Sequence, residues 1–160
     1  MAITYTQFLM LLLSACAVGT TAATGSYRDW GSNSPHYKRS HKEIIVGGSA
    51  NWSFGFNYSD WAFKNNPFFL KDTLVFKYDR PVENKTRPHN VWLLPDLQSL
   101  STCNFSKGVK IANETEGAGE GFKFVLKEFK PYYFACGIGD GIHCNIGNMR
   151  FLVVPAISDD

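Results

Sequence analysis

Residues 132–154 read YYFACGIGDGIHCNIGNMRFLVV, with two short apolar runs on either side of a glycine-rich loop. The runs at 132–136 and 149–154 are rich in Phe, Tyr and Val, which is typical of strands that bury one face. Four glycines between the runs favour tight turns over a long helix. The segment therefore predicts a strand, a loop and a second strand.

Five further runs of this kind precede that unit, each four to six residues long. They lie at 43–46, 73–78, 90–94, 108–112 and 122–126. One short helix is expected at 59–64, where Ser59 could cap the first turn. Seven short strands separated by turn signals favour an all-β sandwich over an α/β fold.

The N-terminal residues resemble a secretory signal, which we place at 1–23. The apolar run at 8–13 is too short to span a bilayer, and small residues follow it up to a plausible cleavage site at 21–23. The alternative is a buried N-terminal strand or helix. Residues 24–42 are polar and basic and predict a flexible arm, in which His36 and His41 are expected to be solvated. The domain itself is expected at 43–155, followed by a short acidic tail at 156–160.

Sequons for N-glycosylation favour the secretory route. Five occur after the signal, at Asn51, Asn57, Asn84, Asn104 and Asn113. No second apolar segment follows, so we expect neither a transmembrane helix nor a GPI-type tail. A secreted glycoprotein is predicted.

Composition excludes several functional classes. The formal net charge is only +2, so no strong attraction to nucleic acid is implied. The aromatic share of 15 % suits a compact β core, which is the expected role of the runs at 54–56 and 67–70, rather than a ligand pocket. No Ser/His/Asp pattern of a hydrolase is present, so we expect a protein that is not an enzyme and has no catalytic residues.

The cysteine count points to one special thiol. Cys16 would leave with the signal, which leaves Cys103, Cys136 and Cys144 in the mature chain. In an oxidising compartment two of these should pair, and one is left over. A thiol left unpaired outside the cell is expected to have a task.

Metal-ligating residue types gather around the same loop. One unpaired cysteine, His143 and Met149 would join His89, which is the other histidine of the domain. Two His, one Cys and a weak axial Met form the ligand set of a blue-copper electron-transfer site. Zinc held by three cysteines and one histidine is the rival interpretation, but an oxidising compartment disfavours it. His89 taken alone would be an ordinary surface or core histidine.

Over about residues 43–154 the chain resembles the plant phytocyanins, which are blue copper proteins. The motifs that carry the resemblance occur in the family's order: VGGS at 46–49, YSDWA at 58–62, DTLVFKY at 72–78, HNV at 89–91, YYFAC at 132–136 and HC at 143–144. The resemblance implies a cupredoxin-like Greek-key β-sandwich that binds one type 1 copper ion. Several ordered motifs are far more specific than any one of them.

The resemblance also implies roles for individual residues. His89 matches the first imidazole ligand, Cys136 the thiolate and His143 the second imidazole, while Cys103 and Cys144 match the family's disulfide. The implied function is one-electron transfer, and the protein would be a monomer that meets an unknown small-molecule or protein redox partner. It would act outside the cell, in the cell wall or at the outer face of the plasma membrane.

Three departures from the family pattern accompany this resemblance. Six residues separate Cys136 from His143, where family members usually have four, and Lys71 stands where a glycine is usual. Family spacing would place Asn148 in the axial position, but strand alternation favours Met149, because an inward Asn148 would drive Arg150 toward the core. With Met149 inward, Arg150 is expected to point to solvent. The departures keep open an alternative function: a copper-free structural or ligand-binding protein of the cell surface, on the same fold.

Overall fold

A computed structural model describes residues 40–83 and 87–157. The predicted signal peptide, most of the basic arm with His36, the sequon at Asn84 and the last residues of the acidic tail lie outside the described residues. No helix within the described ranges is long and apolar enough to cross a membrane.

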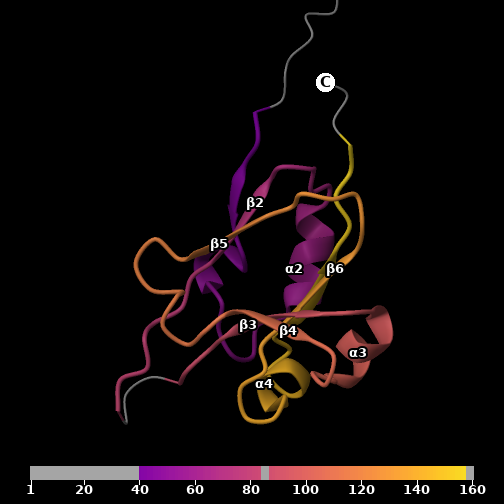
Figure 1. Cartoon of the computed structure of the whole chain (residues 1–160). Coiled ribbons are helices and arrows are strands. Elements are labelled where there is room, and N and C mark those ends of the chain that lie inside the picture. The colour runs from indigo at the N-terminus through magenta and orange to yellow at the C-terminus, as the bar shows by residue number, and fades with distance from the viewer. Residues whose placement is uncertain (1–39, 84–86, 158–160) are drawn as a thin grey trace, which may run out of the picture. The chain divides into compact units, whose positions relative to one another are not determined.

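Within the described ranges seven strands form two sheets, as the sequence predicted (Figure 1). The three-stranded sheet has the order β1 (Glu43–Ile45), β2 (Thr73–Phe76) and β5 (Phe122–Val125). The four-stranded sheet has the order β4 (Val109–Ala112), β3 (Val91–Leu94), β6 (Tyr132–Ala135) and β7 (Arg150–Val153). β1 and β2 are parallel, and the other neighbouring strands are antiparallel. Each strand lies within its predicted run and is shorter by one or two residues.

The expected helix is present as α2 (Tyr58–Asn65), but its predicted cap is wrong. The side chain of Asn57 accepts a hydrogen bond from the backbone N–H of Asp60 at 3.0 Å, so Asn57 occupies the cap position. Ser59 is already inside the helix, and its hydroxyl donates to the carbonyl of Arg150 at 3.2 Å. The sequence did not predict η1 (Gly48–Ala50), α3 (Leu97–Thr102) or α4 (Ile142–Asn145).

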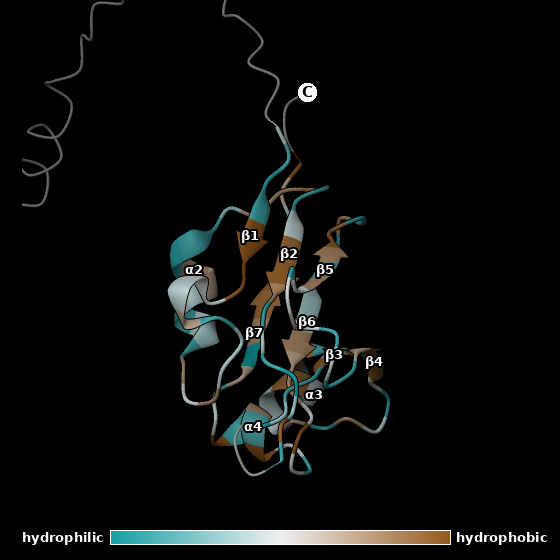
Figure 2. Cartoon of the chain, turned by 90° about the vertical axis from the view of Figure 1, so that its left-hand side faces the viewer, coloured by the Kyte–Doolittle hydropathy of each residue, from teal (hydrophilic) through white to brown (hydrophobic). Residues whose placement is uncertain are grey.

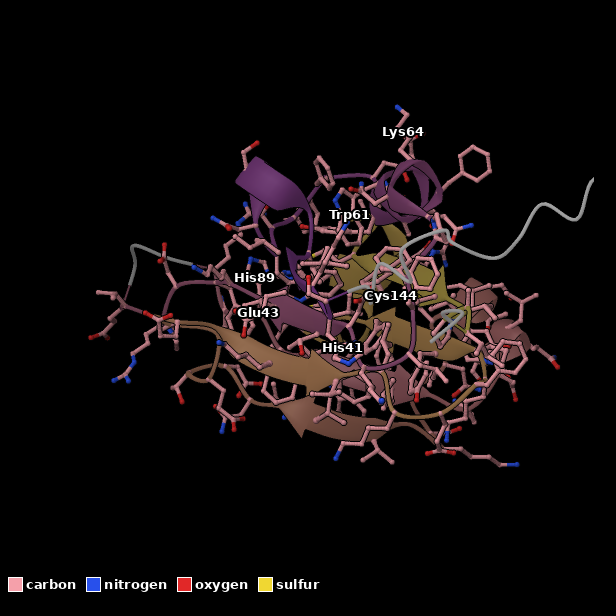
Figure 3. The ribbon with its side chains drawn as sticks, turned by 90° about the horizontal axis from the view of Figure 1, so that it is seen from above. His41, Glu43, Trp61, Lys64, His89 and Cys144 are labelled. Atoms are coloured by element: carbon pink, nitrogen blue, oxygen red, sulfur yellow. A yellow bond between two sulfur atoms is a disulfide. The ribbon has the colours of Figure 1, made fainter. Side chains whose placement is uncertain are left out.

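Helix α2 is amphipathic across the edge of the sandwich. Trp61 packs edge-on against Phe151 of β7, with ring centroids 5.5 Å apart, and Phe68 lies on its other side at 5.9 Å. Lys64 on the same helix points away from the domain (Figure 3), where it pairs with Asp60 at 2.8 Å. The helix thus covers the end of the core nearest β7.

Aromatic rings fill the space between the sheets. Trp52 contacts Phe76 at 5.3 Å, and Phe76 contacts Phe134 at the same centroid distance. Phe134 in turn stacks on Phe151 at 5.1 Å, and all four side chains are almost completely buried. Hydrophobic colouring accordingly covers most of β1, β2 and β7 (Figure 2). Full burial of such a side chain contributes about 1.5–3 kcal/mol to folding.

The expected core role of the two aromatic runs is confirmed for the described side chains. Phe68 is 1 % exposed, and Phe54 and Phe56 are partly buried against the main core. Phe54 also contacts the ring of His143 edge-on at 5.1 Å. One aromatic residue of the core therefore reaches the end of the domain where the histidines lie.

Candidate metal centre

His89, Cys136 and His143 come together at one end of the sandwich, and all three are buried. The Nδ1 atoms of the two imidazoles lie 3.1 Å apart. The Cys136 sulfur lies 3.9 Å from Nδ1 of His89 and 3.6 Å from Nδ1 of His143. Three potential ligand atoms from three separate segments of the chain therefore face one another.

The spacing of these atoms fits a single metal ion. A point equidistant from all three lies about 2.1 Å from each, close to metal–nitrogen distances of about 2.0–2.1 Å and metal–sulfur distances of about 2.3 Å. A thiolate with two imidazoles suits copper and zinc, whereas calcium and magnesium require oxygen ligands. Within the described ranges no other group of His, Cys, Asp and Glu residues converges in this way.

Strand pairing brings two of these residues together. His89 lies two residues before β3, and Cys136 directly follows β6. Because β3 and β6 are antiparallel and Trp92 pairs with Ala135, the start of one strand lies beside the end of the other. His89 and Cys136 therefore meet at the same end of the sheet.

The longer loop after Cys136 returns His143 to the centre by means of α4, which lies at the lower end of the domain in Figure 1. Gly141 has a φ of +87° and caps the start of the helix, a conformation that glycine adopts readily. The N–H of His143 donates to the carbonyl of Ile138 at 3.3 Å, and the N–H of Met149 donates to the carbonyl of His143 at 3.0 Å. The six residues between Cys136 and His143 thus end in a hydrogen-bonded helical turn.

Asn90 joins the two segments that carry His89 and Cys136, a role that sequence reasoning missed. Its side-chain oxygen accepts from the N–H of Gly137 at 2.8 Å and lies 3.7 Å from the Cys136 sulfur. Its side-chain nitrogen donates to Glu114 at 2.9 Å, and its carbonyl accepts from the indole of Trp52 at 3.0 Å. The available signal was its position beside His89, within the motif at 89–91.

Burial controls the protonation of the centre. It lowers the pKa of His89 to about 4, helped by the nearby charges of His143 and Arg87. Burial likewise lowers the pKa of His143, and it raises the pKa of the Cys136 thiol to about 11. The imidazoles are therefore neutral at pH 7 and present free lone pairs, whereas metal binding by Cys136 requires release of the thiol proton.

Met149 and Asn148 differ in the way that strand alternation predicted. Met149 is 0 % exposed and belongs to the same buried cluster as Cys136, and the N–H of Cys136 donates to the Met149 carbonyl at 3.0 Å. Asn148 is exposed and has a φ of +53°. The buried side chain at this point of the chain is therefore the thioether and not the amide.

The expectation for Arg150 was wrong. Its guanidinium does not point to solvent but donates to the carbonyls of Leu100 and Ser101, at 3.2 and 2.8 Å, and lies 3.2 Å from the sulfur of Cys103. These carbonyls belong to the last turn of α3, where a cation is favourable. Arg150 thus connects β7 to the helix that carries one half of the disulfide.

The disulfide between Cys103 and Cys144 is confirmed, and Cys136 is the free, buried thiol. Cys144 directly follows His143 on α4, and Cys103 is the residue after α3. The bond therefore ties α4, the helix that carries His143, to the C-terminal end of α3. It also contradicts the zinc interpretation, because Cys103 and Cys144 have no thiolate to offer.

Comparisons with known proteins identify the family of this chain. The chain is 38 % identical over 95 residues to early nodulin-like protein 20 of Arabidopsis thaliana, a match that covers 59 % of this chain but only 51 % of that relative. It is 32 % identical over 106 residues to stellacyanin of Toxicodendron vernicifluum, covering 64 % of this chain and 86 % of the relative. The chain is a phytocyanin.

A solved structure of cucumber stellacyanin with Cu²⁺ has the same fold. It superposes with a TM-score of 0.58 at 27 % identity, covering 76 % of this chain and 100 % of the stellacyanin chain. No family model matches the sequence. The cupredoxin-like sandwich and membership of the phytocyanins are therefore established, and the phytocyanin resemblance of the motifs is confirmed.

Proposed function

We propose that this phytocyanin binds one copper ion through His89, Cys136 and His143, with Met149 in the axial position, and carries single electrons. The observation that supports the proposal most directly is the convergence of Nδ1, Nδ1 and Sγ at distances that suit one metal ion. Bound copper would supply a one-electron couple between Cu(II) and Cu(I). Imidazole and thiolate ligands suit both of its oxidation states.

The protein's own groups would keep the site rigid. Asn90 holds the segments of His89 and Cys136 together, and the disulfide beside His143 holds the third ligand. A site that changes shape little when an electron arrives keeps the barrier to transfer low. The stellacyanin that this chain resembles was solved with Cu²⁺, which supports copper over other metals here.

Electrons would leave through His143. His143 lies on the short helix α4. Ile142 on this helix and Ile146 directly after it are 53 % and 68 % exposed, so an apolar surface is available close to this ligand in the chain. The partner that docks there would be a small molecule or a protein with a matching potential. Purified, copper-loaded protein should give a reversible one-electron wave on an electrode, and stoichiometric copper without such a wave would contradict the role of carrier.

The axial role of Met149 has its own test. Met149→Leu should keep the three strong ligands and raise the potential further, because it removes even the weak thioether donor and Cu(II) depends on electron donors more than Cu(I) does. Asn148→Ala should leave the potential unchanged, since Asn148 is exposed. A shift in Asn148→Ala together with a silent Met149→Leu would show that the amide, and not the thioether, approaches the copper.

Secretion and glycosylation are part of the same proposal. The four sequons that lie in the described ranges are all on exposed residues, namely Asn51, Asn57, Asn104 and Asn113. An attached glycan would therefore meet no steric barrier at these asparagines. Removal of N-glycans from protein made in a plant secretory system should lower its mass, and an unchanged mass would contradict this part of the proposal.

A further inference from the structure

A groove with a volume of about 630 Å³ lies between the edge strands of the two sheets, β4 and β5, beside the segment that joins β5 to β6. Leu94 and Tyr132 line it, and they stand at the ends of β3 and β6 opposite to the metal centre. Since strand residues rise about 3.3 Å each, a four-residue strand puts roughly 10 Å between these ends. The groove is a separate feature from the metal centre.

The groove is basic. Lys107, Lys123, Lys127 and Lys130 line it, against Glu128 as the one acidic lining residue among those described. The whole chain has a formal net charge of only +2, so this excess of lysines is a local concentration. Such a surface attracts an anionic partner.

The ammonium groups are available to a ligand. Lys123 pairs with Glu43 at 2.7 Å, and Lys130 pairs with Glu128 at 3.0 Å. The side chains of both pairs are 45–66 % exposed. Exposed pairs of this kind are weak, so an incoming anion can exchange with their carboxylates. Lys107 and Lys127 are exposed and form no ion pair with another described residue.

The floor and rim of the groove are aromatic and aliphatic. Phe124, Tyr132 and Tyr133 line it, and Val109 and Val125 on the two edge strands are 62 % and 37 % exposed. The C–H faces of sugar rings are apolar and pack well on side chains of this kind, while nearby polar groups fix their orientation. The groove therefore combines separated positive charges with flat apolar contacts.

The type of cation indicates the type of anion. The lining holds lysines and no arginine among the described residues. Arginine is the residue for a single carboxylate or phosphate held by two parallel hydrogen bonds, whereas lysines act as separate point charges. Several lysines over an apolar floor suit a chain of sugar rings with one carboxylate on each ring.

We infer that this groove binds a carboxylated polysaccharide, a chain of uronate sugars. The carboxylates would meet the lysines, and the faces of the rings would pack on the tyrosines and valines. The inference is independent of the proposed copper function, because no lining residue belongs to the metal centre.

Calorimetry with an oligomer of about ten galacturonate units at physiological salt tests the inference. The purified protein should bind the oligomer, and Lys107→Gln/Lys127→Gln should weaken binding about ten-fold through loss of two charge-assisted contacts. Lys42→Gln/Lys64→Gln is the matched control, since it removes the same charge from exposed positions outside the groove and should change binding by less than about two-fold.

Three results would overturn the inference. The first is absence of binding by the unsubstituted protein, which would leave the lysines as protection of two sheet edges against pairing with other chains. The second is equal weakening in the control variant, because attraction would then be general and not local. The third is equally tight binding of a methyl-esterified oligomer or of a glutamate peptide of the same length, because recognition would then lack either the charge or the sugar.

Discussion

The aromatic interior and the metal end of this phytocyanin are stabilised by different forces. In the interior, Trp52, Phe76, Phe134 and Phe151 are held by apolar burial and ring packing. At the metal end, the ligand segments are held by hydrogen bonds from Asn90, by a disulfide and by backbone turns with positive φ. Substitutions in the two regions should therefore act through different mechanisms.

Truncation of a core aromatic ring should have the largest effect on the free energy of unfolding. Phe151→Ala removes a ring that is 0 % exposed and should lower the free energy of unfolding by about 3–5 kcal/mol, because it leaves a cavity between the sheets. Urea unfolding of the metal-free protein measures this loss. Leu152→Ala on the outer face of the same strand is the control and should cost about 1 kcal/mol or less. Equal losses in the two variants would contradict the assignment of the core.

Opening the disulfide should cost nearly as much, through the other mechanism. Cys103→Ala/Cys144→Ala frees a loop with a sequence separation of 41, and the free energy of unfolding should fall by about 2–5 kcal/mol. The fold should persist, but copper should dissociate faster, because α4 with His143 loses its covalent connection. The rate of copper release to a chelator, followed at pH 7 without denaturant, measures this effect. An unchanged release rate would show that hydrogen bonds alone fix His143.

Acid should lower the stability of the metal-free protein, because His89 takes up a proton more readily in the unfolded chain. Its pKa is about 4 in the folded chain and 6.5 in the unfolded chain, so between these values only the unfolded chain binds the proton. The contribution to stability is therefore fully present above pH 6.5 and is lost as the pH falls toward about 4. Thermal melting across this range should show a steeper decline for the natural sequence than for His89→Asn. Parallel curves would contradict the buried, neutral imidazole.

The smallest expected effect is a gain in the free energy of unfolding. Lys71 has a φ of +68°, in the left-handed region that side chains with a Cβ disfavour. Lys71→Gly should relieve this strain, and after allowance for the greater freedom of glycine in the unfolded chain the gain should be about 0.5–1 kcal/mol. Lys64→Gly, in the interior of α2, should instead cost about 1 kcal/mol. A loss of stability in Lys71→Gly, measured by urea unfolding, would contradict this account of the departure from the family's glycine.

The strands could be predicted from the sequence because burial on one face leaves a local pattern. Phe151 and Val153 are buried and Leu152 between them is partly exposed, which is the alternation that a single strand requires. The ends were less predictable. Cys136 was included in its strand, but its N–H bonds to Met149 outside the regular ladder.

The missed helices gave weaker local signals. α3 begins at an Asp96 cap that follows a proline, a signal that was present but was not used. α4 has four residues, too few for a periodic pattern, and it depends on Gly141 and on the disulfide. The cap of α2 was misplaced by two residues because Asn57 and Ser59 are both good cap residues.

The candidate centre could be predicted only in part from residue types. His89, Cys136 and His143 were identified because blue-copper ligands are distinctive and the motifs matched a known family. Asn90 and Arg150 act through contacts between segments more than 40 residues apart in sequence. No local pattern indicates such contacts, so the support around the centre became visible only in the folded chain.

The absorption spectrum of the oxidised, copper-loaded protein tests the central claim most directly. If Cys136, His89 and His143 hold one copper ion, the protein should take up one equivalent and show an intense thiolate-to-copper band near about 600 nm. Cys136→Ser should fold, as its circular dichroism would show, and should lack the band. Protein that stays colourless after loading with Cu(II) would contradict the claim and favour the copper-free alternative.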